Sequence, residues 1–189
     1  MKKLALSLAL AALAGPALAH TGHDAANGFL LGLAHPVTGA DHLLAMVAVG
    51  LWSGFALPRH LWAGAASFLS AMVAGALLSW GGIGFPLVET AITASVLAFG
   101  LLTLLARRGQ PAGLTALSLG AIAAFAMAHG HAHATEAAGN ALGYLSGFMI
   151  ATAALHLAGI LMARLITRPM AQRAVGAGIA LSGLLLMAG

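Results

Sequence analysis

The stretch HPVTGADHLLAMVAVGLWSGFAL, residues 35–57, combines the two features that govern this chain. From Gly39 to Leu57 it is apolar and close to the length of about 20 residues that a helix needs to cross a bilayer. Its first residues nevertheless include His35, Asp41 and His42. Ionisable groups inside a membrane helix are costly and usually functional. The stretch therefore predicts a membrane helix with a polar site at one end.

The composition of the whole chain excludes a soluble globular domain. Of its 189 residues 61% are hydrophobic and 6% are charged, and the mean hydropathy is +0.99. Five further apolar stretches of near-bilayer length follow the first, at 61–79, 87–106, 112–128, 141–163 and 173–187. The connections are short, and the fourth is expected to run from His129 to Asn140. We predict an all-α integral membrane protein, a six-transmembrane-helix bundle in one domain.

The N-terminus has the three zones of a secretory signal peptide. Lys2 and Lys3 precede an apolar run at 4–13, and small residues follow at 16–19. We expect cleavage after Ala19, which makes residues 1–19 a signal peptide and 20–189 a six-helix transmembrane domain. An uncleaved first span is the alternative, although the apolar run is short for a spanning helix.

The charged residues predict the orientation of the bundle. Six arginines are the basic residues of the mature chain, and they fall in the first, third and fifth connections: Arg59, Arg107, Arg108, Arg164, Arg168 and Arg173. Because basic residues near span ends stay cytoplasmic, we expect a multi-pass membrane protein with both mature termini on the outer (periplasmic) side. The high pI then reflects topology, and no nucleic-acid partner is expected.

The first polar cluster lies at the outer start of the first helix. Pro36 suits the first turn of a helix, where its missing N–H costs nothing. His35 and His42 are seven residues apart, so a continuous helix would return them to one face. A metal ion could be held by this pair, with Asp41 as a further ligand or orienting an imidazole from behind. The alternative is that His35 and Asp41 cap a helix end while His42 is a hydrogen-bonded residue of the bundle.

The second polar cluster is HGHAHATE, residues 129–136. His129, His133 and Glu136 are spaced so that they form one stripe on a helix, and His131 would point the other way. Imidazole and carboxylate groups without any Cys suit Ni, Co or Zn. No Glu adjoins the first His as a zinc-protease helix requires. A His-rich outer loop that binds metal loosely is the alternative.

Five further residues are candidates for the metal pathway, and His131 of the second cluster is one of them. Glu89 would add a carboxylate at the outer side, or simply favour the helix dipole. His156 lies deep in the fifth helix as a relay or as a packing residue. His20 and His23 would lie at the mature N-terminus and capture metal there.

The run HPVTGADHLLAMVAVGLW, with HGHAHATE about ninety residues later, a leader and six spans, resembles the HupE/UreJ family of nickel permeases. The resemblance implies secondary transport of Ni²⁺ inward across a bacterial inner membrane, supplying nickel enzymes such as hydrogenase or urease. By position, His35, Asp41 and His42 match the family's HPxxGxDH element. His129 and Glu136 match the ends of the second element, whereas His133 matches less closely because Ala134 replaces an expected Gly.

The expected mechanism is capture, partial dehydration and passage of the ion, so the protein is not expected to be an enzyme. Its partners are a divalent transition-metal ion and the lipid bilayer; Ni²⁺ is a transported substrate, with Co²⁺ and Zn²⁺ left open, and no prosthetic group or nucleotide is expected. Two alternatives use the same residues: a membrane zinc metalloenzyme, and a haem protein that pairs His42 with His156. The oligomeric state is not indicated.

Overall fold

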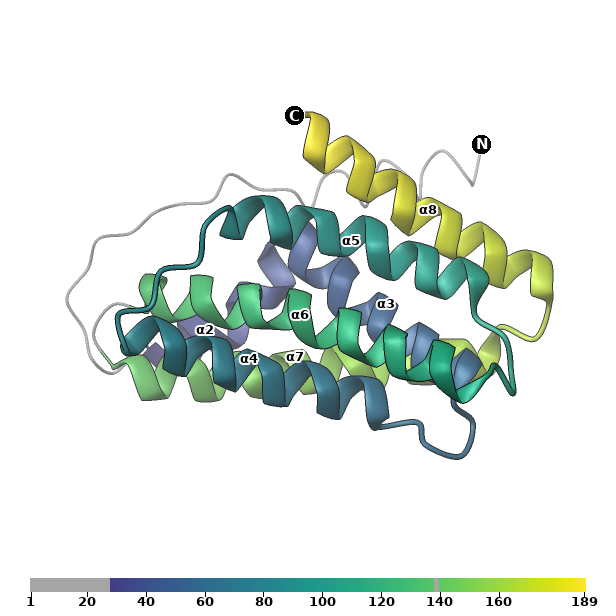
Figure 1. The fold of residues 1–189 in the computed structure, drawn as a ribbon, viewed down its shortest axis with the longest axis horizontal. Coiled ribbons are helices and arrows are strands. Elements are labelled where there is room, and N and C mark those ends of the chain that lie inside the picture. The colour runs from purple at the N-terminus through teal and green to yellow at the C-terminus, as the bar shows by residue number, and fades with distance from the viewer. Residues whose placement is uncertain (1–27, 138–139) are drawn as a thin grey trace.

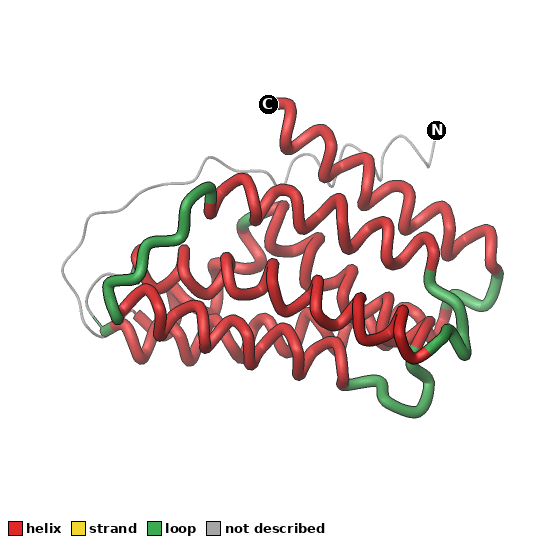
Figure 2. Tube along the Cα trace, in the orientation of Figure 1, coloured by secondary structure: helices red, strands yellow, loops and turns green. Residues whose placement is uncertain are grey.

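The computed structural model describes residues 28–137 and 140–189, and this part of the chain is all helical. Seven helices form a bundle (Figures 1 and 2). They are α2 (Gly28–Thr38), α3 (Ala40–Ala56), α4 (Ala63–Trp80), α5 (Val88–Leu105), α6 (Ala112–Glu136), α7 (Ala141–Leu165) and α8 (Pro169–Ala188). The predicted signal peptide and its cleavage site, with His20 and His23, lie outside the described residues.

Five of these helices, α4 to α8, are long and apolar enough to cross a membrane. The pair formed by α2 and α3 is apolar enough as a unit, but it is bent by 78° at Gly39. The described residues therefore contain five candidate spans, or six if the bent pair counts as one. This agrees with the predicted all-α membrane bundle and changes its first helix.

The break at Gly39 corrects the expectation of one continuous first helix that begins at Pro36. Pro36 instead lies inside the last turn of α2. The C-terminal end of α2 is closed by two bonds to the carbonyl of His35, from the Gly39 N–H and the Thr38 hydroxyl. Gly39 then takes an extended conformation and becomes the N-cap of α3. Proline and glycine so close together weaken helix continuity, and the chain turns there.

Glycines let the neighbouring helices pack closely. A Cβ atom on Gly130 of α6 would collide with the Met72 carbonyl of α4, and one on Gly75 of α4 would collide with the Met127 carbonyl of α6. Small residues allow such approach in membrane helix pairs. Figure 1 shows α4 and α6 side by side along the bundle, with α8 packed along α5. The contact at Gly130 holds the histidine-rich segment of α6 against α4.

The segment 129–136 is part of α6, so the expected connection from His129 to Asn140 is wrong for its first eight residues. Only residues 137–140 join α6 to α7. Backbone groups near lipid are best satisfied within a helix, which favours continuation of α6 through the histidines. The helical stripe predicted for His129, His133 and Glu136 is thereby confirmed.

A candidate metal site at one end of the bundle

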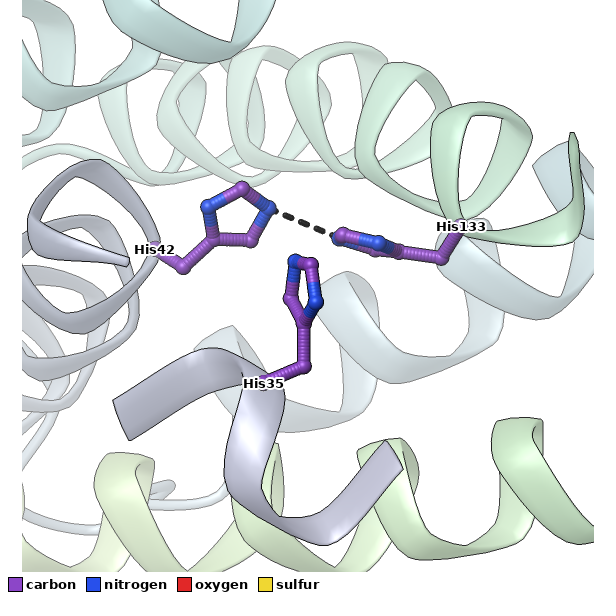
Figure 3. Close-up of side chains that lie close together, drawn as sticks. All are labelled: His35, His42 and His133. Atoms are coloured by element: carbon purple, nitrogen blue, oxygen red, sulfur yellow. Dashed lines mark hydrogen bonds between the residues drawn. The ribbon is translucent and has the colours of Figure 1, made fainter. Parts of the chain in front are cut away.

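Three imidazoles from three different helices meet where α2 joins α3. His35 of α2, His42 of α3 and His133 of α6 each offer one nitrogen, and these atoms all lie within 4.8 Å of one another. The ring centroids are separated by 5.3 Å for His35 and His42, and by 4.7 Å for each of these rings and His133. Figure 3 shows the three side chains pointing toward one another. The bend at Gly39 brings His35 and His42 together without a shared helix face.

Carboxylates behind two of the rings determine where their protons lie. The Nδ1 atom of His42 is 2.6 Å from Asp41 Oδ1, and Nδ1 of His133 is 3.2 Å from Glu136 Oε2. An ionised carboxylate only accepts hydrogen bonds, so each Nδ1 donates its proton. The Nε2 atom of each neutral ring then carries a lone pair. Such a carboxylate behind a histidine is a common support for a metal ligand.

The two Nε2 atoms face each other at 2.7 Å, as the dashed line in Figure 3 marks. Two lone pairs at this distance repel, and a cation between them removes the repulsion. Nitrogens at about 2.1 Å from a tetrahedral ion lie about 3.4 Å apart, so the two Nε2 atoms must separate by roughly 0.7 Å from their present 2.7 Å to admit one. The donor set of His42 and His133 thus fits a borderline divalent metal ion.

Access to the three-histidine cluster is one-sided. The side chains of His42 and His133 are 8% and 1% exposed, whereas those of His35 and Glu136 are 34% and 48% exposed. The Glu136 carboxylate also approaches His35, with Oε2 at 3.9 Å from Nε2. An ion that arrives from solvent therefore meets His35 and Glu136 before the buried pair.

His129 lies next to this cluster without belonging to it. Its ring centroid is 5.0 Å from that of His42, and its Nε2 is 3.1 Å from Ser95 Oγ. Because that hydroxyl donates to the Ile92 carbonyl, it accepts from Nε2–H, and the lone pair falls on Nδ1. The Nδ1 atom is buried and has no hydrogen-bond partner among the described residues. His129 is therefore close to His42, but the ring whose Nε2 faces the Nε2 of His42 is that of His133.

His156 of α7 is a further fully buried histidine. Its Nδ1 donates to the Thr152 carbonyl at 2.7 Å, which leaves Nε2 with a lone pair and with no partner in the described part of the chain. The ring of Phe68 contacts both His156 and His129, at centroid distances of 5.0 and 5.4 Å. His156 lies 15 residues beyond Ala141, about 22 Å along α7. His129 and His156 thus lie at increasing distances from the end of the bundle that holds the three-histidine cluster.

The remaining predicted residues lie outside the cluster. The Nε2 atom of His131 is 2.8 Å from the Ile83 carbonyl, so this side chain points away, as expected for a helix. Glu89 is exposed in the first turn of α5, and its side chain has no ion pair within the described ranges. Sequence reasoning missed Ser95, and also Phe148, whose ring packs on His133 at 4.0 Å. Only the contacts between helices distinguish these two from other residues of apolar segments.

Helix lengths, hydropathy and the buried histidines together define a multi-pass membrane protein with a candidate metal site. The chain belongs to the HupE / UreJ protein family, whose model matches residues 8–186. It is 40% identical over 195 residues to Protein HupE of Rhizobium leguminosarum bv. viciae, with all of both chains covered. No solved structure matches the chain. The family expected from the two histidine motifs is confirmed, and membership does not favour the metalloenzyme or haem alternatives.

Proposed function

We propose that this protein is a secondary transporter that carries Ni²⁺ inward across a bacterial inner membrane and supplies nickel enzymes such as hydrogenase or urease. The observation that carries the proposal is the pair of Nε2 atoms of His42 and His133, which face each other with carboxylates behind both rings. Family membership supports transport. Co²⁺ and Zn²⁺ are the competing ions, because imidazole ligands accept all three.

Capture begins at the exposed side of the cluster. His35 and the Glu136 carboxylate attract a hydrated cation and replace part of its water. The ion then passes to the buried nitrogens of His42 and His133. In this arrangement the carboxylates of Asp41 and Glu136 act from behind the rings, and the ion contacts neutral ligands. Conduction requires binding that is favourable on entry and weak enough for release, and neutral imidazoles suit both needs.

Inward passage uses the two deeper histidines in succession. His129 offers Nδ1 next to the cluster, and His156 offers Nε2 farther along the bundle, each fully buried and without another partner in the described residues. Single-nitrogen sites bind less strongly than the outer cluster, so an ion is not trapped there. The sequence contains no nucleotide-binding motif. The driving force is then the membrane potential, about 2.3 kcal/mol per charge for each 100 mV, and twice that for a divalent ion.

We expect the histidine cluster to lie on the outer side of the membrane. The described arginines lie in the α3–α4, α5–α6 and α7–α8 connections or in the helix turns next to them, at the end of the bundle opposite to His133. Basic residues favour the cytoplasmic side, so both mature termini are periplasmic. Cysteine introduced at Gly84, where a side chain meets nothing within 4 Å, is expected to react with an impermeant reagent in spheroplasts. Cysteine at Gly113 is expected to stay unlabelled until the membrane is permeabilised, and the reverse pattern contradicts this orientation.

Uptake of radiolabelled Ni²⁺ into proteoliposomes with a negative interior tests transport. The wild-type protein is expected to accumulate nickel faster than empty liposomes, and His42→Ala is expected to abolish this difference. His60→Ala is the matched control, since His60 is an exposed histidine in the α3–α4 connection. Parallel runs with Co²⁺ and Zn²⁺ measure selectivity. Wild-type uptake no faster than that of empty liposomes would refute the proposal.

A further inference from the structure

A cleft of about 810 Å³ lies at the end of the bundle opposite to the histidine cluster. It is bordered by the connection from α5 to α6, the connection from α7 to α8, and the end of α3 near Phe55. Five exposed arginines line it: Arg107, Arg108, Arg164, Arg168 and Arg173. The cleft thus gathers five of the six arginines of the chain.

These five guanidinium groups have no acidic partner among the residues that the structure describes. The ion pairs found there all join histidines to Asp41 or Glu136, and the third described acid, Glu89, begins α5 at the other end of that helix. Five like charges around one cleft repel one another, and a bound anion offsets that repulsion. The tendency of basic residues to stay cytoplasmic explains why arginines occur at this end. It does not explain why they surround a single cleft that leaves out Arg59.

The other lining residues suit an amphipathic ligand. Gln172 donates from Nε2 to the carbonyls of Thr103 and Ala106, which ties the start of α8 to the end of α5 and holds the cleft in shape. Apolar side chains complete the lining, among them Ile166 and Leu105, and Leu105 is 66% exposed. A charged head can contact the arginines while an apolar tail runs along the exposed leucine.

We propose that this cleft binds a phosphate group, and that its source is the headgroup of an anionic phospholipid. All the basic residues here are arginines, whose planar guanidinium binds phosphate through two parallel hydrogen bonds. Basic sites between membrane helices on the cytoplasmic side bind such headgroups. The cleft lies at the helix ends, where lipid headgroups lie, and its apolar border favours a lipid over free phosphate. This site is separate from the metal path and does not depend on it.

Native mass spectrometry of the purified full chain tests the proposal with cardiolipin, phosphatidylglycerol, phosphatidylcholine and inorganic phosphate. Wild type is expected to retain the two anionic lipids in preference to phosphatidylcholine. The variant R164Q/R168Q is expected to bind cardiolipin about five-fold more weakly for each arginine removed, the equivalent of the roughly 1 kcal/mol that a basic residue contributes near an anionic surface. R59Q is the matched control, because it removes the same side chain at the same end but outside the cleft.

Equal loss of cardiolipin in R59Q and R164Q/R168Q would overturn the proposal, as would equal retention of phosphatidylcholine and cardiolipin by wild type. If loss of charge prevents insertion of the Gln variant, R164K/R168K keeps the charge and removes the paired hydrogen bonds. That variant must then bind cardiolipin more weakly than R59K, and equal binding overturns the proposal. Retention of inorganic phosphate by wild type without retention of anionic lipid would also overturn the proposal, because it would assign the arginines a soluble ligand.

Discussion

Asp41 holds the His42 ring from behind, so its replacement tests whether the cluster is a metal site. Asp41 Oδ1 accepts from His42 Nδ1 at 2.6 Å and from the His42 backbone N–H at 2.7 Å. In Asp41→Asn the amide oxygen can still accept both bonds, so the ring keeps its orientation and loses only the nearby negative charge. In Asp41→Ala the ring also loses its orienting partner, and Nδ1 and Nε2 compete for the proton.

Loss of a carboxylate behind a metal-bound histidine lowers metal affinity by about 10- to 100-fold, or about 1.4 to 2.7 kcal/mol. We expect Asp41→Asn near the lower value and Asp41→Ala near the upper one. Nickel affinity is measured on purified protein by competition with a fluorescent chelator. Initial uptake rates into proteoliposomes are measured from limiting to saturating nickel, and His60→Ala serves as the control.

The two measurements must agree. If Asp41 acts through His42, weaker binding accounts for slower uptake at limiting nickel, and saturating nickel restores most of the wild-type rate. Wild-type nickel affinity in both Asp41 variants would refute the assignment of the site. Normal affinity combined with slow uptake at every nickel concentration would show instead that Asp41 serves a later step of transport.

Three further substitutions are predicted from the contacts of single side chains. His133→Ala is expected to abolish uptake at limiting nickel, whereas His131→Ala, which removes only a bond to a backbone carbonyl, is expected to keep most of it; equal damage contradicts the division of the two residues. His156→Leu is expected to slow uptake while the affinity of the outer cluster stays within about two-fold, since its nitrogen lies deeper in the bundle; a large loss of affinity contradicts a separate deeper site. Gly130→Ala is expected to destabilise the protein by about 1–3 kcal/mol, because the added methyl collides with the Met72 carbonyl, and a thermal unfolding temperature equal to wild type contradicts this.

The sequence predicts the membrane helices well because helix formation in a bilayer is a local matter. Each spanning segment satisfies its own backbone hydrogen bonds, so an apolar run between polar or glycine-rich breaks is enough to place α4, α5 and α7. The same argument extends α6 through its histidines to Glu136. The stripe of His129, His133 and Glu136 follows from helical spacing alone.

The bend at Gly39 depended on tertiary structure. Pro36 and Gly39 permit a break, but they do not set its direction. In the structure α2 packs closely on α7, where a Cβ on Gly32 would meet the Tyr144 carbonyl and one on Gly147 the Phe29 carbonyl. This packing turns α2 away from α3 by 78°, and a straight helix could not make the same contacts.

The composition of the cluster also depended on how the helices pack. His42 and His133 are 91 residues apart, and both His129 and His133 lie on the predicted stripe, so spacing alone does not say which of their rings faces His42. In the structure the Nε2 atom of His129 contacts Ser95 Oγ, and the Nε2 atom of His133 faces His42. Contacts between membrane helices depend on close packing of small residues and not on a difference in hydrophobicity. Because the apolar faces of such helices are alike in sequence, the sequence determined the helices and their polar residues, and only the packed bundle determined which polar residues meet.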